Sequence, residues 1–382
     1  MSSALHRPAS GRDNFLQFAH RSTVLYSFSS PPRPAACRPW LPGLVAAPLT
    51  VAIALGGSGT LLPLNAQAQQ PAPRQELLLV SYAVTKAAYD KIIPRFTADW
   101  KKRTGQTVVV RTSYGGSGSQ TRAVIDGLAA DVVGLALTAD TLKLEEAGLI
   151  RPGWEKENPN NSIITNSVVA FFVRPGNPKK IRTWNDLDNK NVEVITANPK
   201  TSGGARWNFL GLWGSVTETG GNEAKARAFV TNVYRNVDTL PKDAREATDV
   251  FVKRNQGDVL LNYENEAILA RKSGTWKTPY IVPTTNILIE GPIAVVDRNV
   301  DRKGTRRVAE AFARYLYSEP AQRAFAEEGF RPVNAKVKAE TRSRFAPVSK
   351  LFTARDFGGW DTINKRFFGK GGLWDSIFSK SR

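Results

Sequence analysis

The sequence predicts an α/β protein with two lobes, each a mostly parallel sheet flanked by helices, and with a cleft between the lobes. Apolar stretches rich in Val and Ile alternate with amphipathic stretches of helical period, which is the pattern of strands joined through helices. The turns between them, at 114–120 and 198–208, are rich in glycine and serine. A chain of 382 residues is also long enough for two domains, and its hydrophobic content of 41% is typical of globular proteins.

The first 68 residues have the pattern of an export signal. The stretch 41–64 is uncharged and mostly apolar, Arg33 and Arg38 precede it, and Ala66-Gln67-Ala68 follows it. We predict a signal peptide with an extended n-region over 1–68, cleaved after Ala68, and a linker over 69–75. Glycines and prolines make the apolar stretch a poor membrane helix, which favours secretion over anchoring.

The composition that remains after cleavage excludes several kinds of chemistry. Both histidines, the only Cys and the only Met lie in the leader, so Ser-His or Cys-His nucleophiles, Cys/His zinc sites and thiol redox chemistry are excluded. We expect no cofactor and assign no metal ligands, although carboxylates alone leave a metal site or an acid pair open. The leader holds five Lys or Arg and one acid, so about 48 basic and 33 acidic residues remain, a charge of about +15. Because the basic residues are scattered, a small anion is a better partner than nucleic acid.

The first lobe is predicted over 76–164 and again over 274–382. Glu76 to Tyr82 has the pattern of a buried strand, and an amphipathic helix that contains Pro94 follows and ends at Gly105. Further strands are expected over 107–112 and 131–137, and helices over 121–128 and 139–149. Strands over 280–284 and 286–297 should return the chain to this lobe, and the C-terminal helices should pack on it.

The second lobe is predicted over 165–273. The near-continuous apolar run 167–174 is typical of a strand buried on both faces, and we place the crossing between lobes there. A strand at 191–196 precedes the turn 198–208, in which Ser202 is the candidate N-cap of the next helix. Helices are expected over 222–234 and after Asp243, also a candidate N-cap. The strand 258–263 should bring Tyr263 to the carboxyl edge of the sheet, where ligands bind in open parallel sheets.

The glycine-serine turns indicate an anion site. The first N–H groups of a helix lack partners within the helix and carry the positive end of its dipole. A helix start that glycines leave free of side chains can therefore bind an anion. Each turn alone is equally explained as a helix cap. Three such junctions between a strand and a helix lie near Ser117, Ser202 and Asp243, and none of them carries an obvious hydrogen-bond acceptor. If they face one cleft, they form a cage of donors. Such a cage suits a fully ionised tetrahedral oxyanion such as sulfate, whereas hydrogen phosphate has an O–H that would meet only donors.

The chain resembles the periplasmic sulfate-binding proteins of ABC transporters from about Glu76 to Trp360. The motifs that carry the resemblance are Val80-Ser81-Tyr82, Tyr114-Gly115-Gly116-Ser117-Gly118, Ala130-Asp131-Val132-Val133, Trp184-Asn185-Asp186-Leu187, Asn198-Pro199-Lys200-Thr201-Ser202-Gly203-Gly204-Ala205-Arg206-Trp207-Asn208, Gly257-Asp258-Val259-Leu260 and Phe357-Gly358-Gly359-Trp360. The resemblance implies a two-lobed type II solute-binding fold, with sulfate held between the lobes mainly by main-chain N–H groups.

The same resemblance implies the ligand set. It consists of the backbones of Ala83, Ser117, Gly203, Gly204 and Ala244, the Ser202 hydroxyl, and Tyr263. Ala83 stands where the family commonly has Asp, and Tyr263 where a Trp supplies an indole N–H. The phenol can also accept a hydrogen bond, which leaves the preference for sulfate over thiosulfate open. Arg206 and Arg245 would support the site from behind; ordinary surface arginines are the alternative.

The implied role is binding and delivery, not catalysis. The lobes would close on sulfate, and the closed monomer would dock in the periplasm on a membrane permease that an ATPase drives. Thiosulfate, molybdate or phosphate are alternative ligands of the same fold. A more distant alternative is a secreted hydrolase that uses the carboxylates Asp258, Glu264 and Glu266 near the predicted cleft edge.

Overall fold

The computed structural model describes residues 74–381. The predicted signal peptide, its cleavage site and all but the end of the predicted linker lie outside these residues. All three assignments therefore stay predictions. Within residues 74–381, no helix combines the length and the apolar character that crossing a membrane requires.

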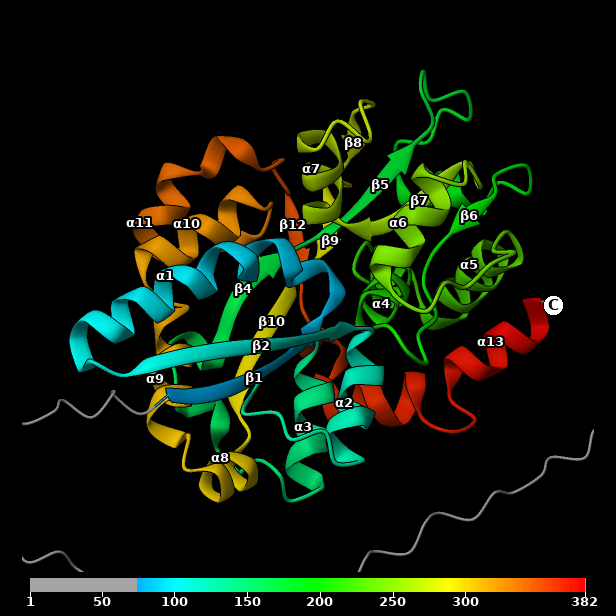
Figure 1. The fold of residues 1–382 in the computed structure, drawn as a ribbon. Coiled ribbons are helices and arrows are strands. Elements are labelled where there is room, and N and C mark those ends of the chain that lie inside the picture. Colours follow the sequence, from blue (N-terminus) through cyan, green and yellow to red (C-terminus); the bar gives the residue numbers. More distant parts are fainter. Residues whose placement is uncertain (1–73, 382) are drawn as a thin grey trace, which may run out of the picture. The chain divides into compact units, whose positions relative to one another are not determined.

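The first lobe is built on a six-stranded sheet with the strand order β11-β4-β10-β3-β1-β2 (Figure 1). Its strands are β1 (Arg74–Tyr82), β2 (Thr107–Gly115), β3 (Val132–Gly134), β4 (Ile163–Ser167), β10 (Ile289–Val295) and β11 (Arg331–Pro332). Strand β1 pairs in parallel with β2 and β3, while β10 runs antiparallel to both β3 and β4.

The second lobe is built on a four-stranded sheet with the order β6-β7-β5-β8. Its strands are β5 (Val169–Val173), β6 (Val194–Ile195), β7 (Val259–Tyr263) and β8 (Tyr280–Ile281). Every residue of β5 and β7 is buried, as the continuous apolar runs predict. A separate parallel pair joins β9 (Thr285–Ile287) to β12 (Lys350–Phe352).

Helices connect and cover these strands. The α-helices are α1 (Lys86–Thr104), α2 (Ser117–Ile125), α3 (Thr138–Glu146), α4 (Gly203–Thr217), α5 (Glu223–Arg235), α6 (Ala244–Val252), α7 (Glu264–Lys272), α8 (Asp297–Lys303), α9 (Arg306–Tyr315), α10 (Glu319–Glu327), α11 (Ala335–Glu340), α12 (Gly359–Ile363) and α13 (Leu373–Ser381). The shorter helical turns are η1 (Ala83–Thr85), η2 (Trp154–Lys156), η3 (Asn160–Ser162), η4 (Trp184–Asp188), η5 (Arg342–Arg344), η6 (Ala354–Phe357) and the π-helical η7 (Asn364–Phe368).

The two lobes confirm the predicted α/β architecture, but the sheets are mixed and not mostly parallel. Strand β5 runs antiparallel to β7 and β8, and β10 runs antiparallel to its two neighbours. Only Val168 separates β4 from β5, so the chain passes directly from one sheet into the other. Parallel pairing is found where helices join consecutive strands, as between β1, β2 and β3.

The second crossing lies later than predicted. The sequence predicts that the chain returns to the first lobe from residue 274 onward. In the structure, however, Ile281 of β8 pairs with Phe171 of β5 in the second sheet. The return therefore follows β8. Local hydrophobic pattern cannot reveal which sheet a two-residue strand joins, because that depends on long-range pairing.

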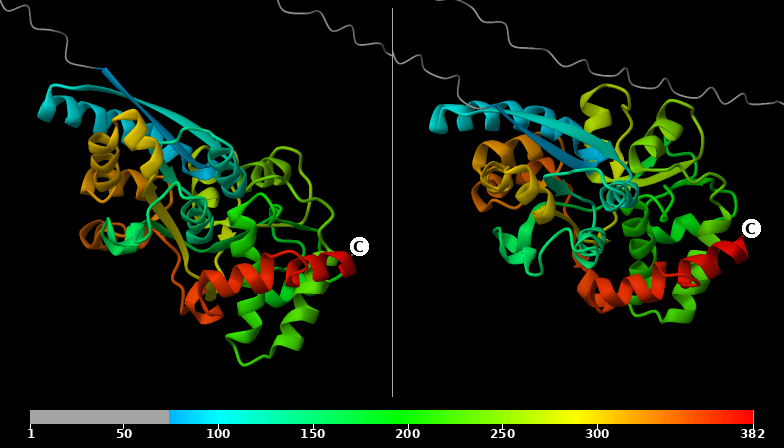
Figure 2. Two further views of the ribbon diagram at one scale, coloured as in Figure 1. Left: turned by 90° about the horizontal axis from the view of Figure 1, so that it is seen from below. Right: turned by 60° about the horizontal axis from the view of Figure 1, so that its bottom comes forward.

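The last helical segment, from η6 to α13, packs mainly on the second lobe and not on the first lobe as predicted, whereas α9 and α10 pack against α1 of the first lobe. The Trp360 ring meets the Trp207 ring of α4 edge-on at 4.9 Å, and Phe367 meets Trp213 in the same way at 5.3 Å. Asp375 forms an ion pair of 2.5 Å with Lys200. Figures 1 and 2 show this segment, in red, beside the green helices α4 and α5. Its aromatic side chains cover α4, all of whose residues from Gly203 to Gly214 are buried.

The helix starts nearest the predicted site have the expected caps. Ser202 Oγ accepts a hydrogen bond from Ala205 N at 3.4 Å, and Asp243 Oδ1 accepts one from Glu246 N at 2.9 Å. Helix α2 begins at Ser117 and not at Thr121, because β2 runs as far as Gly115 and Gly116 serves as the N-cap. This earlier start places Ser117 in the first turn of a helix.

Candidate anion-binding site

All seven predicted ligands line one small cavity between the lobes. It lies where β1, β2 and β7 end, which is the carboxyl edge at which ligands bind in open α/β sheets. The lining residues are Tyr82, Ala83, Val84, Gly115, Gly116, Ser117, Ala136, Ser202, Gly203, Gly204, Asp243, Ala244 and Tyr263. Residues far apart in the sequence are thus brought together as the glycine-serine turns predicted.

Main-chain N–H groups at helix starts surround the cavity. Ser117 is the first residue of α2, Gly203 and Gly204 are the first two of α4, and Ala244 is the first of α6. Such N–H groups have no acceptor within their own helix, and they carry the positive end of its dipole. Ala83 adds the start of the short turn η1. The cavity can therefore hold a negative charge without a cationic side chain.

The Ser202 hydroxyl is oriented by its own helix. Its oxygen accepts the hydrogen bond from Ala205 N, and its side chain is buried at 3% exposure. A hydroxyl whose oxygen accepts from one side keeps its proton for an acceptor on the other. Ser202 can therefore donate to a ligand and cap α4 at once.

The Ser117 hydroxyl, in contrast, is occupied by the protein. It donates to Asp140 Oδ2 at 2.7 Å and accepts from Ala136 N at 3.0 Å. Ser117 thus offers only its main-chain N–H to the cavity. Sequence reasoning missed Asp140, because nothing in Thr138-Ala139-Asp140 signals a partner 23 residues earlier in the chain.

Tyr263 brings an unpaired hydroxyl to the cavity. Its side chain is 2% exposed, and among residues 74–381 its hydroxyl oxygen has no hydrogen-bond partner. Burial raises the pKa of Tyr263 well above its ordinary value of 10, so the phenol keeps its proton at neutral pH. A buried polar group without a partner is unfavourable, and a ligand that accepts its hydrogen bond removes this cost.

The two glycines after Ser202 are required by close packing. A Cβ on Gly203 would lie 2.7 Å from the Ala136 Cβ, and one on Gly204 would lie 2.7 Å from the Tyr263 ring. Any side chain at either position would push a cavity wall outward. Gly203 therefore lets the start of α4 approach Ala136 of the first lobe, and Gly204 lets it approach Tyr263 within the second lobe.

The cavity admits only a small ligand. About 10 Å³ is open to the centre of a water-sized sphere, which is roughly the space of one such sphere. A nucleotide, sugar or peptide cannot be enclosed by this arrangement. Asp243 contributes the only acidic side chain among the lining residues, and its carboxylate already caps α6.

Arg206 lies behind the site, as the resemblance implies, and is not a surface residue. It is 8% exposed, its Nε donates to Pro199 O at 2.9 Å, and its Nη1 lies 3.4 Å from Asp140 Oδ1. Arg245 pairs with Glu266 at 2.6 Å and has a side chain 36% exposed. Neither arginine lines the cavity, and their support of the site stays a prediction.

The carboxylates of the hydrolase alternative are held in structural contacts away from the cavity. Asp258 accepts a hydrogen bond from Glu193 N, Glu264 pairs with Arg331 at 2.7 Å, and Glu266 pairs with Arg245. None of the three lines the cavity. Across 74–381, no group of three or more His, Cys, Asp or Glu side chains is arranged to hold a metal ion.

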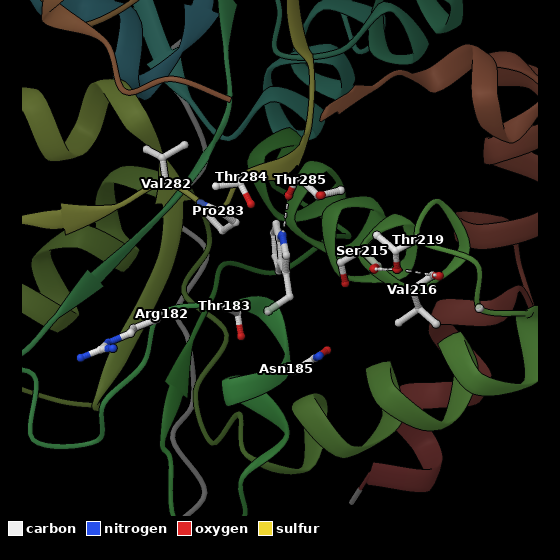
Figure 3. Close-up of a pocket in the computed structure, with 12 residues that line it drawn as sticks. Arg182, Thr183, Asn185, Ser215, Val216, Thr219, Val282, Pro283, Thr284 and Thr285 are labelled. Carbon is white, nitrogen blue, oxygen red and sulfur yellow. Dashed lines mark hydrogen bonds between the residues drawn. The ribbon is translucent and has the colours of Figure 1, made fainter. Parts of the chain in front are cut away.

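A wider cleft of about 460 Å³ lies elsewhere, beside Trp184 (Figure 3). It is lined by the segments 182–185 and 282–285, together with Ser215, Val216, Thr219 and Gly221. The Trp184 indole donates to Thr285 O at 2.8 Å. This cleft contains none of the predicted ligands, and it lacks the converging helix starts of the smaller cavity.

The sequence of residues 77–331 matches the family model of the bacterial extracellular solute-binding proteins. This chain belongs to that family. It is 58% identical over 305 residues to a sulfate-binding protein of Synechocystis, which covers 80% of this chain and 86% of that protein. It is 38% identical over 333 residues to a thiosulfate-binding protein of Pseudomonas aeruginosa, covering 87% of this chain and 97% of the relative.

A solved member of the family shares its fold. The sulfate-binding protein SubI from Mycobacterium tuberculosis superposes with a TM-score of 0.71 at 38% identity, over 77% of this chain and all of that chain. The predicted two-lobed solute-binding fold is thereby confirmed. The cavity described above lies in the cleft between the lobes of this solute-binding protein.

Proposed function

We propose that this solute-binding protein captures sulfate in the cavity between its lobes and delivers it to an ABC permease for import. Its 58% identity to a sulfate-binding protein and its likeness to SubI support sulfate as the ligand. The extracellular family supports action in the periplasm after export. Docking of a monomer on a permease that an ATPase drives completes the proposed role.

The observation that carries the proposal is the convergence of donors on one small cavity. Three α-helix starts, the Ser202 hydroxyl and the unpaired Tyr263 hydroxyl all line it. Sulfate is fully ionised at neutral pH, so every oxygen can accept. Hydrogen phosphate would bring an O–H that needs an acceptor, and leaving it unpaired costs about 1–3 kcal/mol. The N–H groups thus favour a dianion without a proton.

Thiosulfate is a second candidate because of Tyr263. A phenol hydroxyl rotates, so it can point its proton at a larger terminal sulfur better than a fixed N–H can. The thiosulfate-binding relative, at 38% identity, keeps this ligand in consideration. Its lower identity makes sulfate the first choice.

Calorimetric titration of the protein from Gln69 onward tests the proposal. Sulfate, thiosulfate, molybdate and phosphate are titrated at pH 6 and pH 8. We expect one-to-one sulfate binding and no competition from phosphate. Binding of another anion in place of sulfate would contradict the proposed ligand, and turnover of a substrate would contradict the assignment as a binding protein.

A further inference from the structure

A second groove with a strongly basic lining lies between α1 and α9 of the first lobe. It holds about 410 Å³, and the residues that line it include Trp100 and Arg103 from the end of α1 and Arg307, Ala311, Arg314 and Tyr315 from one face of α9. None of the lining residues is acidic. Both the end of α1 and α9 lie on the side of the first lobe that faces away from the second lobe (Figures 1 and 2).

Arg307 stands where its own helix disfavours a positive charge. It is the second residue of α9, whose first turn contains no acidic residue. The positive end of a helix dipole repels a cation there. Its neighbour Arg306 pairs with Asp297 and Asp301, but Arg307 takes part in no ion pair among residues 74–381. An anion bound beside Arg307 would neutralise both its charge and the helix start.

The Trp100 ring holds two of the arginines at the groove. The guanidinium groups of Arg103 and Arg307 each lie 5.7 Å from the centre of this ring, a distance typical of cation–π contacts. The indole N–H donates to Gln106 Oε1 at 2.9 Å and fixes the ring in place. Because a stacked guanidinium keeps its N–H groups in the plane of the fork, Arg307 can still donate to a ligand.

The other two arginines are held only by exposed ion pairs on their own helices. Arg103 pairs with Asp99 at 2.7 Å and Arg314 with Glu310 at 3.6 Å, and their side chains are 53% and 60% exposed. Surface pairs of this kind contribute little to stability. Both arginines can therefore turn toward an anion in the groove without a large cost to the fold.

The chemistry of the groove indicates an organic phosphate. Planar guanidinium groups match the oxygens of a phosphate in pairs. The groove is open and far larger than the cavity between the lobes, so it cannot enclose and dehydrate a bare ion as that cavity can. Beside the arginines, Trp100, Ala311 and Tyr315 offer apolar surface to a carbon group attached to the phosphate.

We propose that this groove binds the phosphate of an anionic lipid headgroup and holds the protein at a membrane surface. Lys101 and Lys102 lie beside the groove, are exposed, and take part in no ion pair within the described part of the chain. A lipid surface presents many phosphates together, so these lysines and the arginines can bind at once, which a single soluble ester does not allow. The inference goes beyond the capture of sulfate and does not depend on it.

Sedimentation with lipid vesicles tests the proposal. The protein from Gln69 onward is mixed, at low salt, with vesicles of phosphatidylglycerol and phosphatidylcholine in equal parts or of phosphatidylcholine alone. We expect binding to the mixed vesicles only. Arg307→Gln should lower the partition constant about fivefold, the size expected for one basic residue at an anionic membrane. Arg307→Lys keeps the charge but loses the fork, so its binding should lie between the two, and Arg314→Gln tests the same groove from its other end.

Arg254→Gln is the matched control for the loss of one positive charge. Arg254 is exposed and follows α6 in the second lobe, away from the groove. This variant should bind the mixed vesicles as the wild type does. Arg307 does not line the cavity between the lobes, so Arg307→Gln should keep the wild-type affinity for sulfate, which also shows that it is folded.

The outcomes that would overturn the proposal are specific. An equal loss of vesicle binding in Arg254→Gln, or full binding by Arg307→Lys, would mean that overall charge and not the groove attracts the membrane. Binding of glycerol 3-phosphate that Arg307→Gln abolishes, without binding to vesicles, would overturn the lipid as the source of the phosphate. Binding of neither would overturn the site. Titration with sulfate decides the proposed function separately in every case.

Discussion

At the scale of single residues, Ser202 combines two roles that substitution can separate. Replacement of Ser202 by Ala removes both a donor to the anion and the cap of α4. We expect sulfate binding to weaken by about 1.5–3 kcal/mol, the usual size for a hydrogen bond to a charged group. Calorimetric titration measures this loss. An unchanged affinity would remove Ser202 from the site.

A second cap provides the control for Ser202. Asn222 caps α5, where its Oδ1 accepts from Lys225 N at 2.9 Å, and it does not line the cavity. Asn222→Ala should lower stability by about 0.5–2 kcal/mol, as the loss of a cap does, and leave the affinity for sulfate intact. Equal losses of affinity in both variants would mean that affinity follows the loss of a helix cap in general and not the loss of the Ser202 hydroxyl.

Substitution of Tyr263 should affect the stability of the free protein and the affinity for sulfate differently. Its hydroxyl has no partner among residues 74–381, so Tyr263→Phe removes an unsatisfied polar group and should not destabilise the free protein. If the hydroxyl donates to the anion, affinity falls by about 1.5–3 kcal/mol. Thermal unfolding with and without sulfate measures both effects. Tyr317→Phe, whose hydroxyl is also unpaired and lies outside the cavity, is the control and should bind as the wild type does.

The affinity for sulfate should stay the same between pH 6 and pH 8. Both histidines precede residue 21, and burial raises the pKa of Tyr82 and Tyr263 above the ordinary value of 10. Neither tyrosine that lines the cavity therefore loses its proton in this range, and both remain donors. Titration in buffers matched for ionic strength checks this. Affinity that rises as the pH falls would point to a group that gains a proton on binding.

At the scale of the elements, the start of α2 sets how closely the lobes approach. A Cβ on Gly116 would lie 2.5 Å from Thr201 O and 3.1 Å from Lys242 O, both in the second lobe. The φ of Gly116 is −63°, which any residue adopts, so Gly116→Ala should fold normally. We expect the methyl group to hold the lobes apart and to weaken sulfate binding at least tenfold. Small-angle scattering with saturating sulfate should show a less closed protein.

Gly118→Ala is the control for Gly116, in the same turn. A Cβ there would meet Thr201 O at 3.4 Å, an ordinary van der Waals distance. This variant keeps its backbone bond to Thr201 and should bind sulfate nearly as the wild type does. A large loss in Gly118→Ala but not in Gly116→Ala would contradict the packing argument.

The same elements show how much the sequence could predict. Local patterns identified the helix starts after Ser202 and Asp243, because caps are encoded within a few residues, but they placed the start of α2 at Thr121 and not at Ser117. The direction of β5 and the place of β8 depend on pairing with distant strands, which no local pattern contains. Asp140 was missed for the same reason, since its contacts with Ser117 and Arg206 exist only in the folded protein.

At the scale of the whole molecule, the two lobes are connected more than twice. The chain crosses between the lobes at Val168 and again after β8. The segment around β12 then pairs with β9, and the C-terminal helices pack on α4 and α5. The aromatic contacts of Trp360 and Phe367 fix that last segment to the second lobe. We therefore expect closure on an anion to move the two lobes as rigid groups, with the anion-binding turns carried by their sheets.

Net charge should govern how fast the anion arrives. The whole chain carries +19, and about +15 remains after the predicted cleavage, so its long-range field attracts a dianion. Sodium chloride screens that field, with a Debye length of about 10 Å at 0.1 M and about 3 Å at 1 M. We expect the association rate of sulfate to fall steeply over this range. The dissociation rate should change little, because the donors around the cavity are shielded from salt. Stopped-flow fluorescence separates the two rates, and sucrose at equal viscosity is the control. An association rate independent of salt would mean that the basic residues serve solubility and not capture.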